Sequence, residues 1–595
     1  MSKKKNKNQV VYTGEVNKGR LLLSILVGLA ITVVLTMILN YIWPSPWNIH
    51  SIECWIKVIV ILVIFCAANG LSVFAGCGEN GMKSQKAVEN TIEMPIFLPF
   101  LVFIGLVFGA CTGAQIFHSE DYANLFQVEE VESTSLILSE KDATSIALMD
   151  TASATQLGDR EIGAIENFSA FEVSYDYIQL NVKGDAVKIA PLEYAGFFKW
   201  MKNKNDGVTG YVTVSPTTMT ADYVKLEEGM KYVPSAYFSQ DLNRLIHKKF
   251  PTLIYDNIHF EVDEEGNPYY IASVYEKTIG LFGGEKVVGA IIVDPISGEA
   301  DYYNLAEVPD WVDNVVNGDL ICELYNLAYK NKNGYWNGTF LGANTGCMQT
   351  TTVDVESEDE DEDEEEIGTD FGYIAKDSDI YIYTGVTSMA ADSSNLGFIM
   401  VNERTGEYKF FAVSGANEQS AMNAAEGEVQ QYNYTSSFPT LINVDEELTY
   451  LGVLKDNSGL VKMYYMVNVK DYGKVSVASS REECVQKYAE KLGLHPDQTL
   501  LDSMEGDGIT EEEEPQSEEE KTEVSFEIQV MEYIDIDGNT YVYMGTPEGT
   551  VYKALFAENE QLLFAKKGDM VSGTITENLV TVEKIEEVHK TETEQ

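Results

Sequence analysis

The sequence predicts a membrane-anchored α+β protein, in which three N-terminal transmembrane helices precede tandem antiparallel-sheet-plus-helix repeats and a small C-terminal β-barrel. Three observations indicate this organisation. Long apolar stretches occur before residue 118, a strand–turn–strand phrase recurs in the middle of the chain, and short strands with alternating apolar residues fill the C-terminal part. At 595 residues the chain is long enough for two or three folded units.

The first apolar stretch follows a basic N-terminus at residues 1–20 and runs without charge from Leu21 to Leu39. This length matches the ~20 apolar residues that cross a bilayer core. Tyr41, Trp43 and Trp47 follow, as expected at the opposite headgroup level. The stretch is longer than the apolar part of a signal peptide, so we interpret it as a retained helix.

Two further spans are predicted at about 58–75 and 94–117, which makes residues 21–117 the membrane domain. Six basic residues precede the first span and two lie between the second and third, so both segments are expected to be cytoplasmic under the positive-inside rule. Because three spans change sides, residues 118–595 are expected outside the cytoplasm. The predicted location is therefore a multi-pass position in the cell membrane.

Small residues recur at four-residue spacing in the two later spans, a pattern that lets helices approach closely in lipid. One interpretation is an interface with another membrane subunit. We favour the simpler one, in which the second and third spans pack on each other. The positions are Ala68, Ser72 and Gly76 in the second span and Gly105, Gly109 and Gly113 in the third.

The net charge of -53 belongs to the soluble region, because residues 1–117 carry 9 Lys/Arg and 5 Asp/Glu whereas the remainder carries 32 and 89. A surface this acidic is expected to repel nucleic acid, which we exclude as a partner, and also anionic lipid headgroups. The expected partners are the lipid bilayer and a protein in the membrane or envelope. Weak, non-specific binding of divalent cations is expected at an acidic loop, residues 348–368.

Residues 118–249 are predicted to form an extracytoplasmic α+β region. A helix is expected near 151–165, and strands at 171–182 and 210–216, where apolar residues alternate. The aromatic phrase PLEYAGFFKWMKN (191–203) has two interpretations. Its rings are suited to stacking on a sugar or peptide, but rings at this spacing more often fill a core.

Residues 250–503 contain the repeats. FPTLI occurs at 250–254 and again at 438–442, and a hairpin phrase occurs at 289–303, 397–411 and 463–477. Helix-like segments follow the hairpins: VPDWVDNVV, NEQSAMNAAEG and REECVQKYAEKLG. Hairpin plus helix, three times, predicts layers of sheet covered by helices on one face.

Each hairpin turn is predicted from an Asp or Asn followed by a Gly. The Asx side chain caps nearby backbone N–H groups, and Gly supplies a positive φ. The predicted turn positions are Asp294 with Gly298, Asn402 with Gly406, and Asn468 with Gly473.

The phrases VDPISGE (293–299) and VNERTGE (401–407), with the looser VNVKDYGK (467–474), resemble the PepSY-type repeat of bacterial envelope proteins. The region at about 118–495 also resembles a large uncharacterised family of bacterial membrane-anchored extracytoplasmic proteins, through phrases such as PLEYAGFFKW, FGGEKVVG and GLVKMY. The resemblance implies an extracytoplasmic, inhibitory or protein-binding module. It implies no catalytic residue.

The last part of the chain is predicted to be a separate domain. The acidic, Pro-containing stretch 504–521 is interpreted as a linker, 522–587 as a small β-barrel and 588–595 as a disordered tail. The Gly-Asp-x-Val phrase at 568–571 resembles small barrels of the OB type. The basic groove that binds nucleic acid in such barrels is missing, which favours a structural or protein-binding role.

No residues with the spacing of a catalytic or metal site were identified, so no cofactor is predicted. The six histidines have no metal-ligand spacing, although His247 and His259 flank the first FPTLI and were considered as a pair. Cys322 and Cys347 are the cysteines best placed to pair, but two separate thiols are favoured. Acidic residues are too abundant to select an acid and a base.

Three functions are consistent with these observations. The leading hypothesis is a non-catalytic, membrane-anchored binding or regulatory protein of the bacterial cell envelope. The alternative is an accessory structural subunit of an envelope or transport complex, which would dock through the glycine stripe of the third span. A hydrolase of envelope polymers is the third and least supported.

Overall fold

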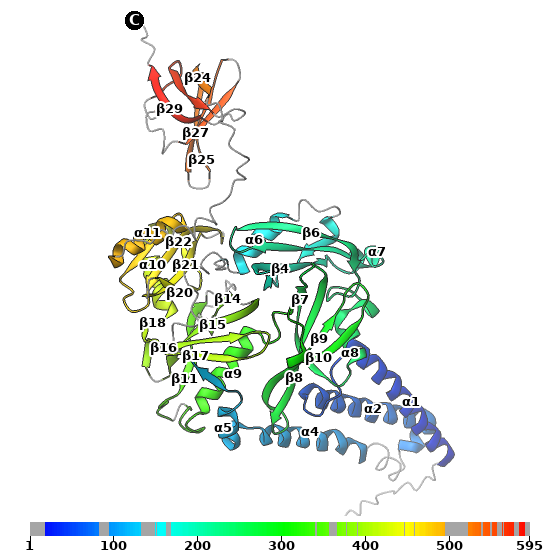
Figure 1. Ribbon diagram of the computed structural model, residues 1–595. Helices are drawn as coiled ribbons and strands as arrows, with labels where there is room; N and C mark the ends of the chain where they lie inside the picture. Colours follow the sequence, from blue (N-terminus) through cyan, green and yellow to red (C-terminus); the bar gives the residue numbers. More distant parts are fainter. Residues whose placement is uncertain are drawn as a thin grey trace, which may run out of the picture. The chain divides into compact units, whose positions relative to one another are not determined.

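The computed structural model consists of two compact units, Met1–Gly508 and Ile509–Gln595 (Figure 1). The structure describes residues 18–82, 94–131, 149, 151–161, 168–339, 342–355, 366–369, 371–376, 378–389, 391–444, 447–456, 459–493, 522–536, 539–547, 550–555, 562, 565–575 and 582–589.

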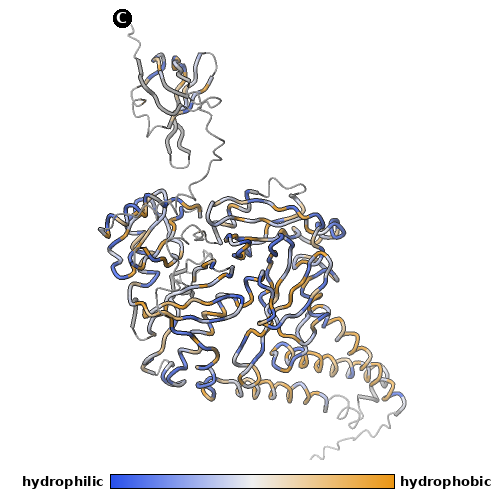
Figure 2. The backbone as a smooth tube through the Cα atoms, in the orientation of Figure 1, coloured by the Kyte–Doolittle hydropathy of each residue, from blue (hydrophilic) through white to orange (hydrophobic). Residues whose placement is uncertain are grey.

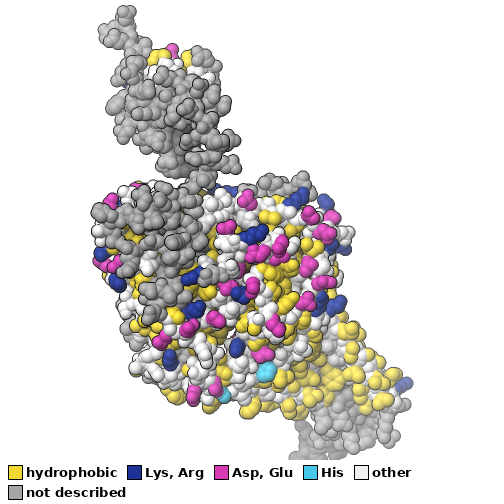
Figure 3. All heavy atoms as spheres, viewed as in Figure 1, with side chains coloured by type: hydrophobic (Ala, Val, Ile, Leu, Met, Phe, Trp, Pro, Cys, Tyr) yellow, Lys and Arg dark blue, Asp and Glu magenta, His cyan; other side chains and the backbone are white. Residues whose placement is uncertain are grey.

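Within these residues, three helices are long and apolar enough to cross a membrane: α1 (Lys18–Ile42), α2 (Ile52–Met82) and α4 (Met94–Thr112). They form the most hydrophobic part of the trace in Figure 2, and in Figure 3 almost no charged side chain lies over them. The prediction of three N-terminal spans is confirmed at this level. The third helix ends five residues early, and the chain continues in α5 (Gln115–Ala123), kinked at His118.

Four antiparallel meanders of four strands each form the body of the first unit. In each meander, consecutive strands pair with one another. The first comprises β3 (Ile178–Val182), β4 (Asp185–Tyr194), β5 (Val208–Ser215) and β6 (Thr220–Met230); the second β7 (Ile254–Val262), β8 (Pro268–Ile279), β9 (Gly283–Val293) and β10 (Ala300–Asn304); the third β14 (Gly372–Lys376), β15 (Asp379–Ser388), β16 (Ala391–Asn402) and β17 (Tyr408–Phe411); the fourth β20 (Thr440–Val444), β21 (Glu447–Lys455), β22 (Val461–Asn468) and β23 (Val475–Ala478).

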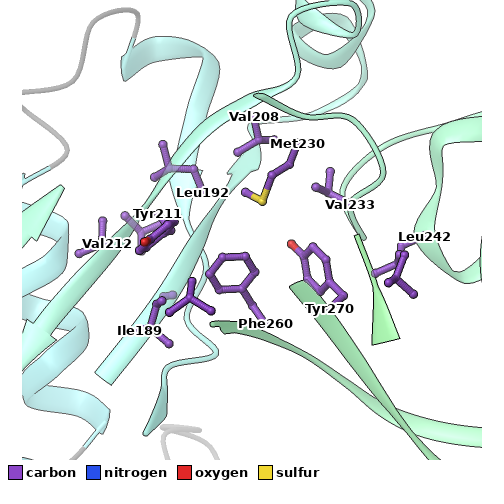
Figure 4. Close-up of a cluster of buried hydrophobic side chains, with 14 of the residues drawn as sticks. Ile189, Leu192, Val208, Tyr211, Val212, Met230, Val233, Leu242, Phe260 and Tyr270 are labelled. Carbon is purple, nitrogen blue, oxygen red and sulfur yellow. The ribbon is translucent and has the colours of Figure 1, made fainter. Parts of the chain in front are cut away.

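The meanders are arranged in a ring, like the blades of a small β-propeller (Figure 1). Between the first two, Phe260 and Tyr270 face Ile189 and Tyr211 in a buried cluster (Figure 4). Further clusters join the second meander to the third and the third to the fourth. Met219, in the turn between β5 and β6, packs against the cluster of the first two meanders and against the cluster that the third and fourth share, so the first meander also lies against this second cluster. Among the first strands of the meanders, β3 contacts β7 and β14, and β14 contacts β20.

Short strands extend these sheets. The segment after α5 joins the third meander, where β1 (Val128–Glu130) pairs in parallel with β17. The others are β2 (Phe171–Val173), which pairs with β4; β11 (Met348–Thr350), which pairs with β15; β18 (Gly415–Ala416), which pairs with β16; and β19 (Thr435–Ser436), which pairs with β21. A separate two-stranded sheet consists of β12 (Thr352–Val355) and β13 (Glu366–Thr369). The predicted disordered loop 348–368 thus begins and ends in strands, and residues 356–365 lie outside the described part.

The helices of the soluble region are shorter than the spans. They are α6 (Thr151–Glu161), α7 (Phe197–Asn203), α8 (Leu242–Lys249), α9 (Gly318–Asn331), α10 (Glu418–Glu428) and α11 (Arg481–Leu492), with single 3₁₀ turns η4 (Phe168–Ala170), η5 (Phe238–Gln240), η6 (Leu305–Glu307) and η7 (Gln430–Tyr432). Residues 162–165, the end of the helix expected at 151–165, lie outside the described part.

The layered arrangement of sheet plus helix is found at the fourth meander, where α10 and α11 both pack on β22 and β23. The expected helix at VPDWVDNVV is wrong: residues 308–317 contain no helix, and α9 begins only at Gly318. The reason is that backbone N–H groups of this segment bond outside it. Those of Asp313 and Asn314 donate to the Glu261 carboxylate, and those of Val315 and Val316 to the carbonyl of Glu403.

In the part of the second unit that the structure describes, the strands form two three-stranded sheets. One comprises β24 (Thr522–Glu527), β28 (Met570–Ile575) and β29 (Val582–His589), and the other β25 (Val530–Ile536), β26 (Asn539–Gly545) and β27 (Val551–Leu555). Phe526 and Val571 from the first share a buried cluster with Val542 and Met544 from the second. No strand pairing among the described residues joins the two sheets, so the OB-type barrel remains a prediction. The predicted linker 504–521 lies outside the described residues.

Candidate functional site

The small-residue stripe of the second span packs on the first span. Ala68 and Ser72 of α2 are buried. A side chain added at Gly28 of α1 would lie 2.9 Å from Ser72 Oγ, and one added at Gly76 would lie 2.2 Å from Ser24 Oγ. The stripe therefore serves the contact of α2 with α1, made within this chain.

The glycine stripe of the third span meets different partners along its length. A Cβ at Gly105 would lie 3.2 Å from the ring of Trp55 on α2, which fits the favoured packing of the second and third spans. Gly109 and Gly113 instead face the tip of the β8–β9 hairpin. A Cβ at Gly109 would lie 2.5 Å from Leu281 Cδ2, and one at Gly113 would lie 2.9 Å from the carbonyl of Ile279.

The hairpin tip is held by polar contacts as well. The Leu281 N–H donates to Thr112 Oγ1 at 3.3 Å, and His50 Nδ1 lies 2.9 Å from the Leu281 carbonyl oxygen. The Tyr122 hydroxyl of α5 donates to the Gly113 carbonyl at 2.6 Å. The end of α4 is thus joined to β8 and β9, which lie about 170 residues further along the chain.

The loop between the first two spans makes a second attachment to the soluble ring. Backbone N–H of Trp47 donates to the Pro251 carbonyl at 2.7 Å, and Asn48 Nδ2 donates to the Thr252 carbonyl at 3.0 Å. At the other end of α8, Arg244 Nε donates to the Tyr41 carbonyl at 3.0 Å. The ring is therefore bonded to the C-terminal ends of both α1 and α4.

Lys57 of α2 forms hydrogen bonds with the end of α1 and with the loop between the first two spans. Its side chain is buried, and Nζ donates to the Ser45 carbonyl at 2.9 Å and to Asn40 Oδ1 at 3.2 Å. The ammonium lies 5.0 Å from the Trp47 ring centroid and 5.9 Å from that of Trp43, within the range of cation–π attraction. Burial lowers the pKa of His247 on α8, and the positive charge of Lys57 lowers it further.

Two of the three predicted turns have the expected geometry. Asp294 Oδ1 accepts from the N–H of Ile296 at 2.8 Å, and the Gly298 N–H donates to the Asp294 carbonyl at 2.8 Å, with Gly298 φ at +77°. Asn402 and Gly406 repeat this pattern, with the same 2.8 Å bond and Gly406 φ at +70°. These positions serve the turn itself.

The third turn differs because it contains one more residue. Asn468 Oδ1 still accepts from the N–H groups of Lys470 and Asp471, at 3.0 and 2.9 Å. The chain then closes through the Lys474 N–H, which donates to the Asp471 carbonyl at 2.9 Å. Gly473 therefore does not adopt a positive φ.

A fourth turn of the same kind, between β5 and β6, was missed by sequence reasoning. Ser215 Oγ accepts from the Thr218 N–H at 3.2 Å, and the Met219 N–H donates to the Ser215 carbonyl at 2.9 Å, with Met219 φ at +57°. Ser and Met occupy the places of Asx and Gly, which hides the motif. The alignment of GYVTVSP with GAIIVDP was the signal available.

Three meanders contribute to a buried polar centre that the sequence did not indicate. Glu261 of β7 is fully buried, and its carboxylate accepts backbone N–H groups of Asp313 and Asn314 at 3.0 and 2.9 Å. His259 Nε2 lies 2.9 Å from the same carboxylate. Asp313 in turn accepts from the backbone N–H of Asn181 on β3 at 2.6 Å.

Glu403, directly after β16, completes this centre. It is fully buried, and neither carboxyl oxygen has a hydrogen-bond partner among the described residues. Burial raises the pKa of Glu403 well above its usual value; the Asp313 and Glu261 carboxylates raise it further, and Lys188 opposes them. Burial, with the Glu261 carboxylate, also raises the pKa of Asp313.

Burial favours the protonated, neutral form of the Glu403 carboxyl at this centre. A buried carboxyl without partners favours its neutral form, because a charge there loses hydration. Within the described ranges, no group of three or more His, Cys, Asp or Glu side chains is arranged to hold a metal ion. The exposed fractions of Glu261, Asp313 and Glu403 are 0, 2 and 0%, so a polymer does not reach them without opening of the ring.

The other sequence candidates lie apart from this centre. Of the two histidines considered as a pair, His259 is the exception, because it contacts Glu261 in this centre; His247 lies on α8 at the membrane-side attachment. Cys347 is a buried free thiol that accepts from Asn337 Nδ2 at 3.2 Å, so it is not disulfide-bonded to Cys322.

A surface groove on the fourth meander, also not expected from the sequence, has a volume of about 570 Å³. Met463 of β22 and Val477 of β23 line it, with Tyr432, Lys487 and Lys491 from the surrounding helical segments. Its lining combines apolar, aromatic and charged groups.

Comparison with known proteins gives no family. No protein-family model matches the sequence, and no curated protein matches it. Among solved structures, an ACO/RPE65 chimera has a TM-score of 0.11 at 7% identity, covering 52% of this chain and 49% of its own. Apocarotenoid oxygenase from Synechocystis has a TM-score of 0.12 at 7% identity, covering 52% of each chain. This chain thus spans about half the length of either protein, and similarity this low carries no information on fold or activity.

Proposed function

We propose that this chain is a non-catalytic, membrane-anchored binding or regulatory protein of the bacterial cell envelope, with its ring of meanders on the extracytoplasmic side. The observation that carries the proposal is the double attachment of the ring to its own spans. The loop at Trp47 and Asn48, which follows the first span, is hydrogen-bonded to the ring. The hairpin tip at Leu281, which belongs to the ring, is hydrogen-bonded to the end of the third span. Such an attachment holds a recognition surface close to the bilayer.

The attachment also supports the proposed orientation. Both contacts with the ring lie at the C-terminal ends of α1 and α4, so the basic segment before Lys18 and the loop between α2 and α4 belong to the other ends of these helices. Together with Lys18 and Arg20 in the first turn of α1, these two segments hold eight of the nine basic residues that precede residue 118. The positive-inside rule then assigns them to the cytoplasm.

Orientation is tested by labelling intact cells with a maleimide that does not cross membranes. Cysteine introduced by Glu360→Cys, in the acidic loop of the soluble region, is expected to react in intact cells. Cysteine introduced by Lys83→Cys, between the second and third spans, is the control and is expected to react only after lysis. The reverse pattern contradicts the proposed side.

The groove on the fourth meander is the binding surface that fits this proposal best, because its lining combines apolar and charged side chains, which suit a peptide or small ligand. Pull-down with the full-length protein, compared with a Met463→Glu variant, tests this role. Loss of a retained partner only in the variant supports binding in the groove. Identical partners with both proteins contradict it.

An accessory structural subunit is the second candidate, favoured by the exposed outer face of α4. Phe97, Leu101 and Phe108 are among its most exposed side chains, and they face either lipid or another membrane subunit. Native mass spectrometry after detergent extraction separates the two. A stoichiometric membrane partner favours the subunit, and a free protein favours the proposed binding or regulatory role.

A further inference from the structure

A basic and aromatic surface lies beside the attachment of the ring to the first span. Four apolar side chains on α7 and at the start of η5 are exposed: Phe198 by 76%, Phe238 by 53%, Met201 by 47% and Tyr237 by 37%. These residues, together with Lys202, Lys204, Lys248 and Lys249, are called the juxtamembrane surface below.

The surface is built on a rigid aromatic base. Trp200 is buried under it, and its Nε1 donates to Gln240 Oε1 at 3.1 Å. Phe197 contacts both Tyr237 and Phe238, with ring centroids 5.1 and 6.2 Å apart. The exposed rings are therefore held in place by the packing of α7 on η5.

One arginine joins this surface to the end of the first span. Arg244 Nη1 donates to the Phe238 carbonyl at 3.4 Å, while its Nε donates to the Tyr41 carbonyl at 3.0 Å. Its guanidinium also lies 4.7 Å from the Tyr41 ring centroid. Phe238 is thus next to the residues where α1 leaves the apolar layer.

The charge of this part of the ring is opposite to that of the rest. The segments 195–206 and 237–253 carry six basic residues, of which three lie on or beside α7 and three on α8, and only two acidic ones. The complete region after residue 117 carries 32 basic and 89 acidic residues. A local excess of positive charge in so acidic a region indicates a negatively charged partner at this place.

We propose that the juxtamembrane surface binds the headgroup layer of anionic phospholipids in the leaflet that the ring faces. Aromatic side chains favour the headgroup level, where the ring is apolar and the surroundings are partly wet. Lysines place their charge at the lipid phosphates while their stems lie on apolar surface. The binding adds a third point of contact to the two attachments and fixes the tilt of the ring on the bilayer.

The test uses photo-crosslinking of the full-length protein in lipid nanodiscs. Benzoylphenylalanine replaces Phe198, or replaces Tyr472 as a matched control, because Tyr472 is 58% exposed but lies on the turn of the fourth meander. The discs contain phosphatidylcholine alone or mixed with phosphatidylglycerol. The expected result is a several-fold higher yield of lipid adducts at Phe198 than at Tyr472, which increases with phosphatidylglycerol.

The contribution of the lysine charges to lipid binding is tested by the variant K202E/K204E in the anionic discs. We expect its adduct yield at Phe198 to fall to the level found in phosphatidylcholine alone, and added salt to lower the wild-type yield in the same direction. Equal yields at the two probe positions, or equal yields in the two lipids, overturn the proposal. Adducts to a protein instead of lipid in native membranes overturn it as well, and assign the surface to a protein partner.

Discussion

Replacing Gly280 with alanine is expected to detach the β8–β9 hairpin from the end of the third span. Gly280 has a φ of +62°, and an added Cβ would lie 2.5 Å from the Thr112 carbonyl and 2.6 Å from the Gly113 backbone nitrogen. Backbone atoms on a helix end do not move aside as a side chain does. The hairpin must therefore move away from α4.

The magnitude follows from what the movement breaks. Alanine at a positive φ costs about 1 kcal/mol by itself. Separation also removes the two hydrogen bonds made by Leu281, to Thr112 and His50, each worth about 1 kcal/mol. The total is about 3 kcal/mol, before the loss of the packing of Leu281 on Gly109.

Hydrogen exchange of the full-length protein measures this local opening. In the Gly280→Ala variant, amides of residues 276–286 are expected to exchange on the order of 100-fold faster, since every 1.4 kcal/mol is a factor of ten. Gly184→Ala is the matched control, because Gly184 has a φ of +94° and nothing within 4 Å of the added Cβ. If both variants leave exchange in 276–286 unchanged, the hairpin does not depend on its contact with α4.

Three further predictions concern the turns, the buried centre and the two units. Gly406→Ala should cost only the ~1 kcal/mol of a positive φ, whereas Gly298→Ala should cost more in denaturant unfolding, because its Cβ meets a tyrosine ring at 2.6 Å; equal costs contradict this. The raised pKa of Glu403 gives stability that is present below its ordinary value of 4.5 and lost as pH rises through the folded value. Glu403→Gln should therefore reduce the fall in unfolding free energy between about pH 5 and pH 8, by ~1.4 kcal/mol per unit of elevation, and an unchanged slope counts against a buried neutral acid. Mild proteolysis at 504–521 should release a folded fragment that begins near Ile509, whereas resistance there argues for a docked second unit.

The features predicted correctly from the sequence depend on local chemistry. An uncharged apolar run of sufficient length predicts a span wherever the chain later goes, and the three helices follow it. The turns at Asp294 and Asn402 are likewise fixed by a side chain that bonds its own next few residues. The turn at Met219 was missed because a methionine, and not a glycine, occupies the position with a φ of +57°.

The features that sequence reasoning missed depend on residues far apart in the chain. Glu261, Asp313 and Glu403 are each separated by at least fifty residues, and nothing in their neighbourhoods predicts that they meet. The glycine stripe of the third span was recognised as a close-packing face. Gly109, however, faces Leu281 of the β8–β9 hairpin and not another helix, and only the tertiary structure determines this contact.

The attachment of the ring to its own spans is tested most directly by a disulfide between Gly109→Cys and Leu281→Cys. A Cβ at Gly109 would lie 3.5 Å from that of Leu281, within the range of disulfide-bonded cysteines. The background is Cys111→Ser, and Gly105→Cys with Leu281→Cys is the control, since Gly105 lies one helical turn away and faces Trp55. We predict near-complete oxidative cross-linking of the first pair in membranes and little of the second. Cross-linking of neither pair, or of both equally, would contradict a ring docked on the end of the third span.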